Sequence, residues 1–202
     1  MHSANPNIDA KVLQPYFFDI GNFVYSINRT KNIILFVAGF GHPPNIDAAI
    51  WLVQDIMPIV WKNNPEIKLY LVGSNPTKEV INLQSTNILV TGYVTDIVLD
   101  EYYTLARVAV VPLRFGAGIK NKVLEALSKC VPLVTTDVGV QGMAELKSLI
   151  PVRNSSSEFA TEIIKLIDDD STWETVSTKG FEYVKLHFSI DSMQSNFEKD
   201  IN

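Results

Sequence analysis

Short apolar runs alternate with helical segments along most of this 202-residue chain, and this alternation limits the folds open to it. Six runs are rich in leucine and β-branched residues and are bounded by glycine, proline, asparagine or aspartate. They span residues 33–38, 69–73, 88–91, 108–112, 131–135 and 149–152. Strands joined by helices form right-handed βαβ units, and parallel strands buried on both faces are continuously apolar. The sequence therefore predicts an α/β fold, a Rossmann-like doubly wound parallel sheet of about six strands with C-terminal helices.

The segments between these runs carry helical periodicity. The clearest has apolar residues at positions 46, 49, 50, 53, 57, 60 and 61. We expect Asn45 to cap the N-terminus of this helix and Pro58 to kink it near its end. After Pro151 the pattern is helical over 155–170 and 173–187. We divide the chain into a linker-like segment (1–31), a Rossmann-like domain (32–187) and a C-terminal helical tail (188–202).

Composition and charge exclude several classes of protein. The net charge of −5 argues against a nucleic-acid partner, which would need a basic face. The single cysteine, Cys130, cannot form an internal disulfide, and we interpret it as a small buried apolar residue. The chain shows no Cys/His cluster, so we expect no metal. It shows no secretory signal and no apolar run of about 18 residues, so we expect a cytoplasmic protein.

The stretch from Gly116 to Ala126 is the strongest candidate for a ligand site. Glycines between a strand and a helix let backbone N–H groups approach an anion, and the helix dipole favours negative charge there. The ammonium groups of Lys120 and Lys122 suit a pyrophosphate, and the Glu125 carboxylate suits a ribose diol. The same spacing also fits a solvated ion pair between Lys122 and Glu125, and Lys120 fits an exposed side chain equally well.

Four loops are expected at the carboxyl edge of the sheet, where ligands bind in open parallel sheets. They span residues 39–45, 73–76, 92–96 and 116–122. The first contains Gly39 and Gly41, but Pro44 stands where a dinucleotide fingerprint needs its third glycine, so we expect no NAD-type site. These glycines either keep the loop thin beneath a ligand or form a tight turn before a helix. His42 in the same loop is a candidate hydrogen-bond donor.

Taken together, these motifs resemble the donor-binding domain of GT-B glycosyltransferases, in the large retaining family of glycosyl transferases group 1. The resemblance rests on residues 36–48, 72–76, 91–96, 112–127, 131–136 and 139–142, which follow the order and spacing of the family. It covers about residues 32–187. It implies one half of a GT-B fold, a nucleoside-diphosphate sugar as substrate with no other cofactor, and a part in cell-envelope polysaccharide biosynthesis.

The resemblance also implies roles for individual residues. Glu125 would hold the ribose of the donor, and Gly118 and Lys122 would lie against its diphosphate. The loop with Tyr93 and Val94 would lie near the base. The complete predicted donor site, in which no residue is assigned a catalytic role, consists of Gly39, Gly41, His42, Tyr93, Val94, Gly118, Ile119, Lys120, Lys122 and Glu125.

The chain departs from the family pattern at two places. Many members carry a sugar-binding glutamate eight positions before the one matching Glu125, and this chain has Ala117 there. Many members also use an arginine and a lysine in the first loop to bind phosphates, and this loop has neither. We therefore expect Lys120, Lys122 and His42 to carry that positive charge.

Size is a third point of comparison with the family. GT-B enzymes react in a cleft between two Rossmann-like domains, and only 31 residues precede the donor domain here. We expect this chain to be the C-terminal half, with the acceptor domain as its missing partner, little activity alone, and peripheral membrane association of the full enzyme. Two alternatives remain open: a non-catalytic interaction module that keeps the fold, and half of a sugar-nucleotide epimerase.

Overall fold

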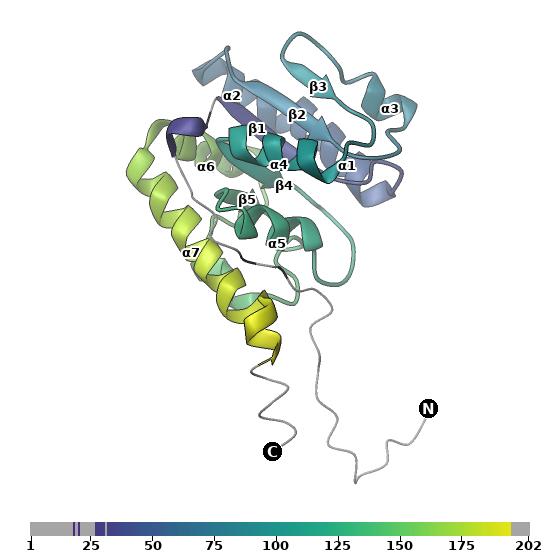
Figure 1. The fold of residues 1–202 in the computed structure, drawn as a ribbon. Helices are drawn as coiled ribbons and strands as arrows, with labels where there is room; N and C mark the ends of the chain where they lie inside the picture. The colour runs from purple at the N-terminus through teal and green to yellow at the C-terminus, as the bar shows by residue number, and fades with distance from the viewer. Residues whose placement is uncertain (1–17, 19, 21–26, 31, 195–202) are drawn as a thin grey trace.

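The computed structural model describes residues 18, 20, 27–30 and 32–194, so most of the expected linker and the end of the expected tail lie outside the described residues. Its centre is a parallel sheet of five strands in the order β3-β2-β1-β4-β5 (Figure 1). The strands are β1 (Ile33–Val37), β2 (Lys68–Val72), β3 (Ile88–Val90), β4 (Val108–Val111) and β5 (Leu133–Thr135). This order confirms the doubly wound α/β prediction.

Helices cover both faces of the sheet, as right-handed crossovers require (Figure 1). One face carries α1 (Pro43–Trp51), the π-helical segment η2 (Leu52–Ile56), α2 (Met57–Asn63) and α6 (Ser156–Asp168). The other carries α4 (Asp96–Leu105), against β1, and α5 (Asn121–Ser128), against β4 and β5. The long α7 (Asp170–Phe188) packs on α5, α6 and β5. Short turns complete the set: η1 (Ile27–Arg29), α3 (Lys78–Ile81) and η3 (Ala144–Ser148).

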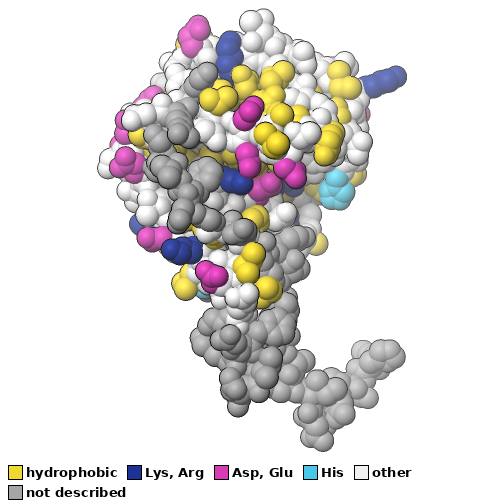
Figure 2. Space-filling model, in the orientation of Figure 1, with side chains coloured by type: hydrophobic (Ala, Val, Ile, Leu, Met, Phe, Trp, Pro, Cys, Tyr) yellow, Lys and Arg dark blue, Asp and Glu magenta, His cyan; other side chains and the backbone are white. Residues whose placement is uncertain are grey.

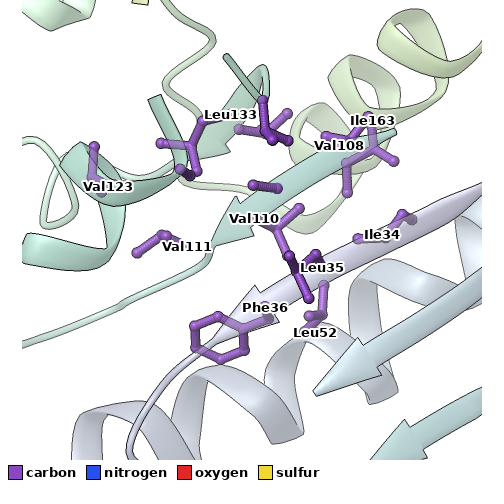
Figure 3. Close-up of a cluster of buried hydrophobic side chains, with 14 of the residues drawn as sticks. Ile34, Leu35, Phe36, Leu52, Val108, Val110, Val111, Val123, Leu133 and Ile163 are labelled. Carbon is purple, nitrogen blue, oxygen red and sulfur yellow. The ribbon is translucent and has the colours of Figure 1, made fainter. Parts of the chain in front are cut away.

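The core lies between the central strands and the helices on either side. Figure 3 shows Ile34, Val110 and Leu133 from three neighbouring strands among the clustered side chains, and all three are buried. Leu52 on η2 and Ile163 on α6 belong to the same cluster, and neither side chain has any exposed surface. Burial of this apolar surface is the main stabilising contribution to the fold.

The sixth predicted strand, at residues 149–152, is reduced to a single bridge. Val152 bridges Thr135 at the edge of β5, with the Thr135 amide donating to the Pro151 carbonyl over 3.1 Å. The first half of the run belongs to the turn of η3 instead, because the amides of Leu149 and Ile150 both donate to the Leu146 carbonyl. Too few residues are then left to extend the sheet.

The first helix begins earlier than predicted, and the cap assigned to Asn45 is wrong. Pro43 and Pro44 occupy the first turn, where proline is well tolerated, so His42 takes the cap position. The helix changes type just before Pro58, where the sequence predicts a kink. The π-helical η2 ends at Ile56, and Pro58 then lies in the first turn of α2.

Gly73 provides a test of how closely the ends of β1 and β2 approach. A Cβ atom at this position would lie 1.9 Å from the Ala38 carbonyl oxygen, and the backbone has a φ of 148°. We expect Gly73→Ala to lower the free energy of unfolding by about 2–4 kcal/mol, because backbone atoms cannot move aside as a side chain can. Gly92→Ala is the matched control, since its added Cβ would meet nothing within 4 Å. Denaturant unfolding of both variants would show this difference, and equal losses would contradict it.

Candidate functional site

The candidate site is the topological switch point between β1 and β4, where the strand order reverses; we call this region the crevice. These strands pair only through Ile34 with Val108 and Leu35 with Ala109, whereas β1 and β2 pair over five positions. The carboxyl halves of β1 and β4 are therefore not joined by ladder hydrogen bonds in the described part of the chain. The loops that leave them, residues 38–42 and 112–120, form the two walls of the crevice. Ligands bind at such switch points in open α/β sheets.

A hydrogen-bonded chain joins the two walls. The Lys122 ammonium on α5 donates to Asn45 Oδ1 over 3.0 Å, and Asn45 Nδ2 donates to the Gly39 carbonyl over 2.8 Å. Asn45 is only 6% exposed, so its amide is fixed between these two partners. The structure thus brings together the predicted residues Gly39 and Lys122 through a residue that sequence reasoning treated as a helix cap.

A second link lies nearer the surface. The Arg114 guanidinium, on the loop after β4, donates from Nε to Asp47 Oδ2 over 2.9 Å and pairs with Oδ1 over 2.5 Å. The same guanidinium lies over the Trp51 ring, 5.5 Å from its centre. Bidentate pairing and ring stacking both favour a fixed arginine. Arg114 therefore anchors the start of the glycine turn to α1.

The two predicted lysines are both held near the start of α5. Lys120 is only 8% exposed, and its Nζ donates to the Gly118 carbonyl over 2.5 Å. Burial lowers the pKa of Lys120, and it lowers the pKa of Lys122 to about 8, with the neighbouring Lys120 charge adding to the effect. Two desolvated cations side by side favour an anion.

The glycine turn leaves the N-terminus of α5 open. Gly116 has a φ of 128° and Gly118 a φ of 76°, conformations that side chains other than glycine rarely adopt. Gly116, Ala117 and Gly118 are exposed, and no side chain caps the first turn of α5. Ile119 is half-buried and lies against Gly142, where an added Cβ would come within 3.0 Å of Ile119 Cγ1. The α5 amides thus face an accessible turn.

Glu125 lies one turn further along α5 and is partly buried. It forms no ion pair with Lys122 among the described residues, so the simple i, i+3 pair is not what holds either side chain. Burial raises the pKa of Glu125, while the Tyr103 hydroxyl and the Lys129 ammonium oppose that rise. Tyr103, on α4, is 1% exposed, and burial with the nearby Glu125 charge raises its pKa well above the ordinary value.

The other predicted residues are placed on the rim. Gly39, Gly41 and His42 are exposed on the first wall. Tyr93 is 78% exposed on the loop that leads from β3 into α4. The helix that follows this loop, α4, lies beside the end of α5, because Asp100 on α4 pairs with Lys129 over 2.8 Å. Among the described residues, no hydrogen bond joins Tyr93 or its half-buried neighbour Val94 to the glycine turn.

Electrostatics around the crevice are mixed. Figure 2 shows acidic and hydrophobic side chains interspersed over α4. The hydrophobic ones include Ile97, which is 76% exposed, and the acidic Asp100 pairs with Lys129 on α5 over 2.8 Å. The part of the chain that the structure describes contains no group of three or more His, Cys, Asp or Glu side chains able to hold a metal ion, and none of its helices is long and apolar enough to cross a bilayer.

Sequence reasoning missed the residues that support the site. Asn45, Asp47, Arg114 and Tyr103 are brought to the crevice by tertiary contacts between distant parts of the chain. Arg114 and Asp47 are 67 positions apart, and Lys122 and Asn45 are 77 apart. The available signal was their position in loops and helices next to strand ends, which does not by itself reveal a partner.

The fold and the placement of the crevice define a class, the Rossmann-like half of the GT-B fold. A family model described as glycosyl transferases group 1 matches residues 31–169, more than half of the chain. The chain belongs to this family of glycosyl transferases.

Solved structures support the fold assignment. The C-terminal domain of the group 1 glycosyl transferase LpcC from Francisella tularensis matches over 99% of its length and 86% of this chain, with a TM-score of 0.67 and 14% identity. Staphylococcus aureus TarM, solved with UDP, fondaparinux and α-GlcNAc-glycerol, matches over 95% of this chain and 40% of its own, with a TM-score of 0.74 and 15% identity. Anabaena HepE, solved with UDP and glucose, matches over 92% of this chain and 55% of its own, with a TM-score of 0.70 and 14% identity.

A curated relative comes from Klebsiella pneumoniae, an uncharacterized 44.6 kDa protein in the cps region. It is 26% identical over 176 residues, which cover 83% of this chain and 45% of the relative. The chain thus spans about 45% of the length of that relative and about half or less of most of the solved enzymes. LpcC, by contrast, was solved as a domain of this kind alone.

The Asn45 bridge can be tested by stability. We expect Asn45→Ala to lower the free energy of unfolding by about 1–3 kcal/mol, because it removes a buried amide that serves both Gly39 and Lys122. The exposed Asn121→Ala is the control and should change stability by less than about 0.5 kcal/mol. Adding Lys122→Met to Asn45→Ala should recover part of the loss, since the unpaired ammonium is then gone. Strictly additive losses in urea unfolding would contradict the bridge.

Proposed function

We propose that this chain binds a nucleoside-diphosphate sugar at the crevice and acts as the donor half of a retaining glycosyltransferase. The observation that carries the proposal is the arrangement at the start of α5. Two desolvated ammonium groups and an uncapped helix N-terminus lie on one side of a partly buried carboxylate. This arrangement offers positive charge to a diphosphate and an acceptor to the adjoining sugar.

Each predicted residue has a role in this proposal. The diphosphate would lie over Gly118 and Ile119, within reach of the α5 amides and the Lys120 and Lys122 ammonium groups. Glu125 would accept hydrogen bonds from the two hydroxyls of the ribose. Tyr93 and Val94 would face the base, since their loop leads into α4 beside Glu125. On the opposite wall, Gly39 and Gly41 carry no side chain that would block a ligand, and His42 would donate a hydrogen bond.

The same groups would assist the transfer step. The bond between the anomeric carbon and the diphosphate oxygen breaks, and its electron pair leaves with the nucleoside diphosphate. The charge that develops on that oxygen would be offset by the ammonium groups and the helix dipole, which are already in place before reaction. The acceptor hydroxyl forms the new bond to the anomeric carbon, and its proton passes to the departing diphosphate oxygen. In the proposal a second Rossmann-like domain supplies the acceptor and the other side of the cleft.

Solved structures of similar proteins support this proposal. HepE, TarM and the pneumococcal O-GlcNAc transferase GtfA were all solved with UDP bound. The proposal also keeps the cytoplasmic location expected from the sequence. It assigns no metal, because lysines and backbone amides would meet the diphosphate charge.

Glu125→Ala tests the proposed grip on the ribose. A hydrogen bond to a charged group contributes about 1.5–3 kcal/mol, so the variant should bind UDP about 10- to 150-fold more weakly in calorimetry. The exposed Glu174→Ala on α7 is the matched control and should bind like the unaltered chain. Equal affinity of the two variants for UDP and GDP would remove Glu125 from the site.

The alternatives from the sequence give different results. A non-catalytic interaction module would bind neither UDP nor GDP at any accessible concentration. An epimerase half would, together with its second domain, isomerise UDP-N-acetylglucosamine in the absence of an acceptor. Measurable UDP binding with no isomerised sugar would support the glycosyltransferase.

The Lys122 pKa of about 8 predicts a pH dependence of donor binding. The free protein loses the ammonium proton as the pH rises through 8, whereas a bound diphosphate would keep it protonated. UDP affinity should therefore fall between pH 7 and 9, approaching about tenfold per pH unit at the upper end. Lys122→Arg should flatten this dependence because a guanidinium stays protonated in that range. An unchanged slope in that variant would rule out Lys122 as the titrating group.

A further inference from the structure

Tyr103 carries a buried hydroxyl that the fold itself does not explain. The residue is 1% exposed, and its hydroxyl makes no hydrogen bond of ordinary geometry. Buried polar groups are nearly always hydrogen-bonded, and an unsatisfied one is costly. A phenylalanine would fill the same space in the core between α4 and the sheet without this cost. The hydroxyl therefore calls for a role other than packing.

The acceptor within reach of this hydroxyl is the Glu125 carboxylate. Asp100, one turn before Tyr103 on α4, pairs over 2.8 Å with Lys129, one turn after Glu125 at the end of α5, so these faces of the two helices meet. The pKa directions agree with this placement: burial and Glu125 raise the pKa of Tyr103, and Tyr103 opposes the rise that burial imposes on Glu125. The surrounding charges are Lys129 and Lys122 on α5 and Asp96 and Asp100 on α4. Among these charged groups Tyr103 is a neutral donor, and its side chain is buried.

We propose that Tyr103 is a positioning residue that donates its hydroxyl to one side of the Glu125 carboxylate and aims the other side at the ligand. The inference rests on the proposed function, because it names what orients the carboxylate that would grip the ribose. A carboxylate has about four acceptor positions, so a donor from the core still leaves room for two ligand hydroxyls. The hydrogen bond from Tyr103 to Glu125 would form when a ligand fixes the carboxylate.

This role differs from that of a residue that only packs. A hydrogen bond from the buried Tyr103 hydroxyl limits the rotamers of Glu125, which otherwise lies on a partly open face of α5. It also keeps the carboxylate ionised in a site where burial and two neighbouring aspartates favour the neutral form. An ionised carboxylate is the better acceptor for a diol. Loss of the Tyr103 hydroxyl would therefore impair both the orientation and the ionisation of Glu125.

Tyr103→Phe separates these effects in three measurements. Its thermal midpoint should be unchanged or higher, because an unsatisfied buried hydroxyl is removed. UDP should bind about three- to tenfold more weakly, as expected for loss of one hydrogen bond. The acidic limb of UDP binding should move to higher pH, because Glu125 then takes up its proton more readily. Tyr102→Phe is the matched control: it is the adjacent residue on α4, with its ring against Tyr70 at 5.7 Å, and should leave all three unchanged.

Titration of the Glu125 carboxyl carbon by NMR in the ligand-free chain gives an independent readout. The proposal expects the pKa of Glu125 to rise in Tyr103→Phe and to stay in Tyr102→Phe. An unmoved Glu125 pKa, or a Tyr103→Phe variant that binds UDP like the unaltered chain while Glu125→Ala does not, would overturn the positioning role alone. If the unaltered chain does not bind UDP, the proposed function fails, and the titration still decides whether Tyr103 holds Glu125.

Discussion

The partial pairing of β1 with β4 is the constraint on which the site depends. The two strands are joined at their first positions, where Ile34 and Val108 are fully buried, and this contact holds the two halves of the sheet together. Beyond it the ladder stops, and the loops after the two strands separate. Side chains then take over the connection, through Lys122 to Asn45 and through Arg114 to Asp47. The crevice is thus not joined by backbone hydrogen bonds between β1 and β4 beyond Leu35 and Ala109, and side chains bridge its two walls.

Desolvation shapes the chemistry of this crevice more than any single ion pair. Burial lowers the pKa of both lysines and raises that of Glu125, so each charged form is held at a cost. Charged groups that are desolvated in this way favour binding of a ligand that brings each of them a partner of opposite charge or a hydrogen bond. The surface pairs elsewhere, such as Lys147 with Asp137, lie in solvent and contribute little to stability.

Much of the fold could be predicted from the sequence because it follows from local patterns. Five of the six apolar runs are strands, since continuous burial on both faces leaves a continuous apolar signal. The prediction of the sixth strand was wrong because the first residues of that run form the turn of η3 instead. Hydrophobicity alone does not distinguish these two local structures. The site was predictable only in outline. Glycine and lysine spacing marked the turn before α5, but no local rule connects Asn45 with Lys122 or Tyr103 with Glu125, because those contacts form only after the helices pack.

The departures from the family pattern acquire a physical meaning in this structure. The first loop lacks the basic residues that many relatives use, and the nearest arginine, Arg114, is not available in their place because Asp47 holds both arms of its guanidinium. The positive charge must then come from Lys120 and Lys122. In the described part of the chain, their hydrogen-bond acceptors are neutral, the Gly118 carbonyl and the Asn45 amide. A diphosphate would offer these ammonium groups an acceptor of opposite charge, so it would displace both neutral acceptors. Asn45 would then no longer be fixed between Lys122 and the Gly39 carbonyl. Binding of a diphosphate at the second loop would in this way change the conformation of the first loop.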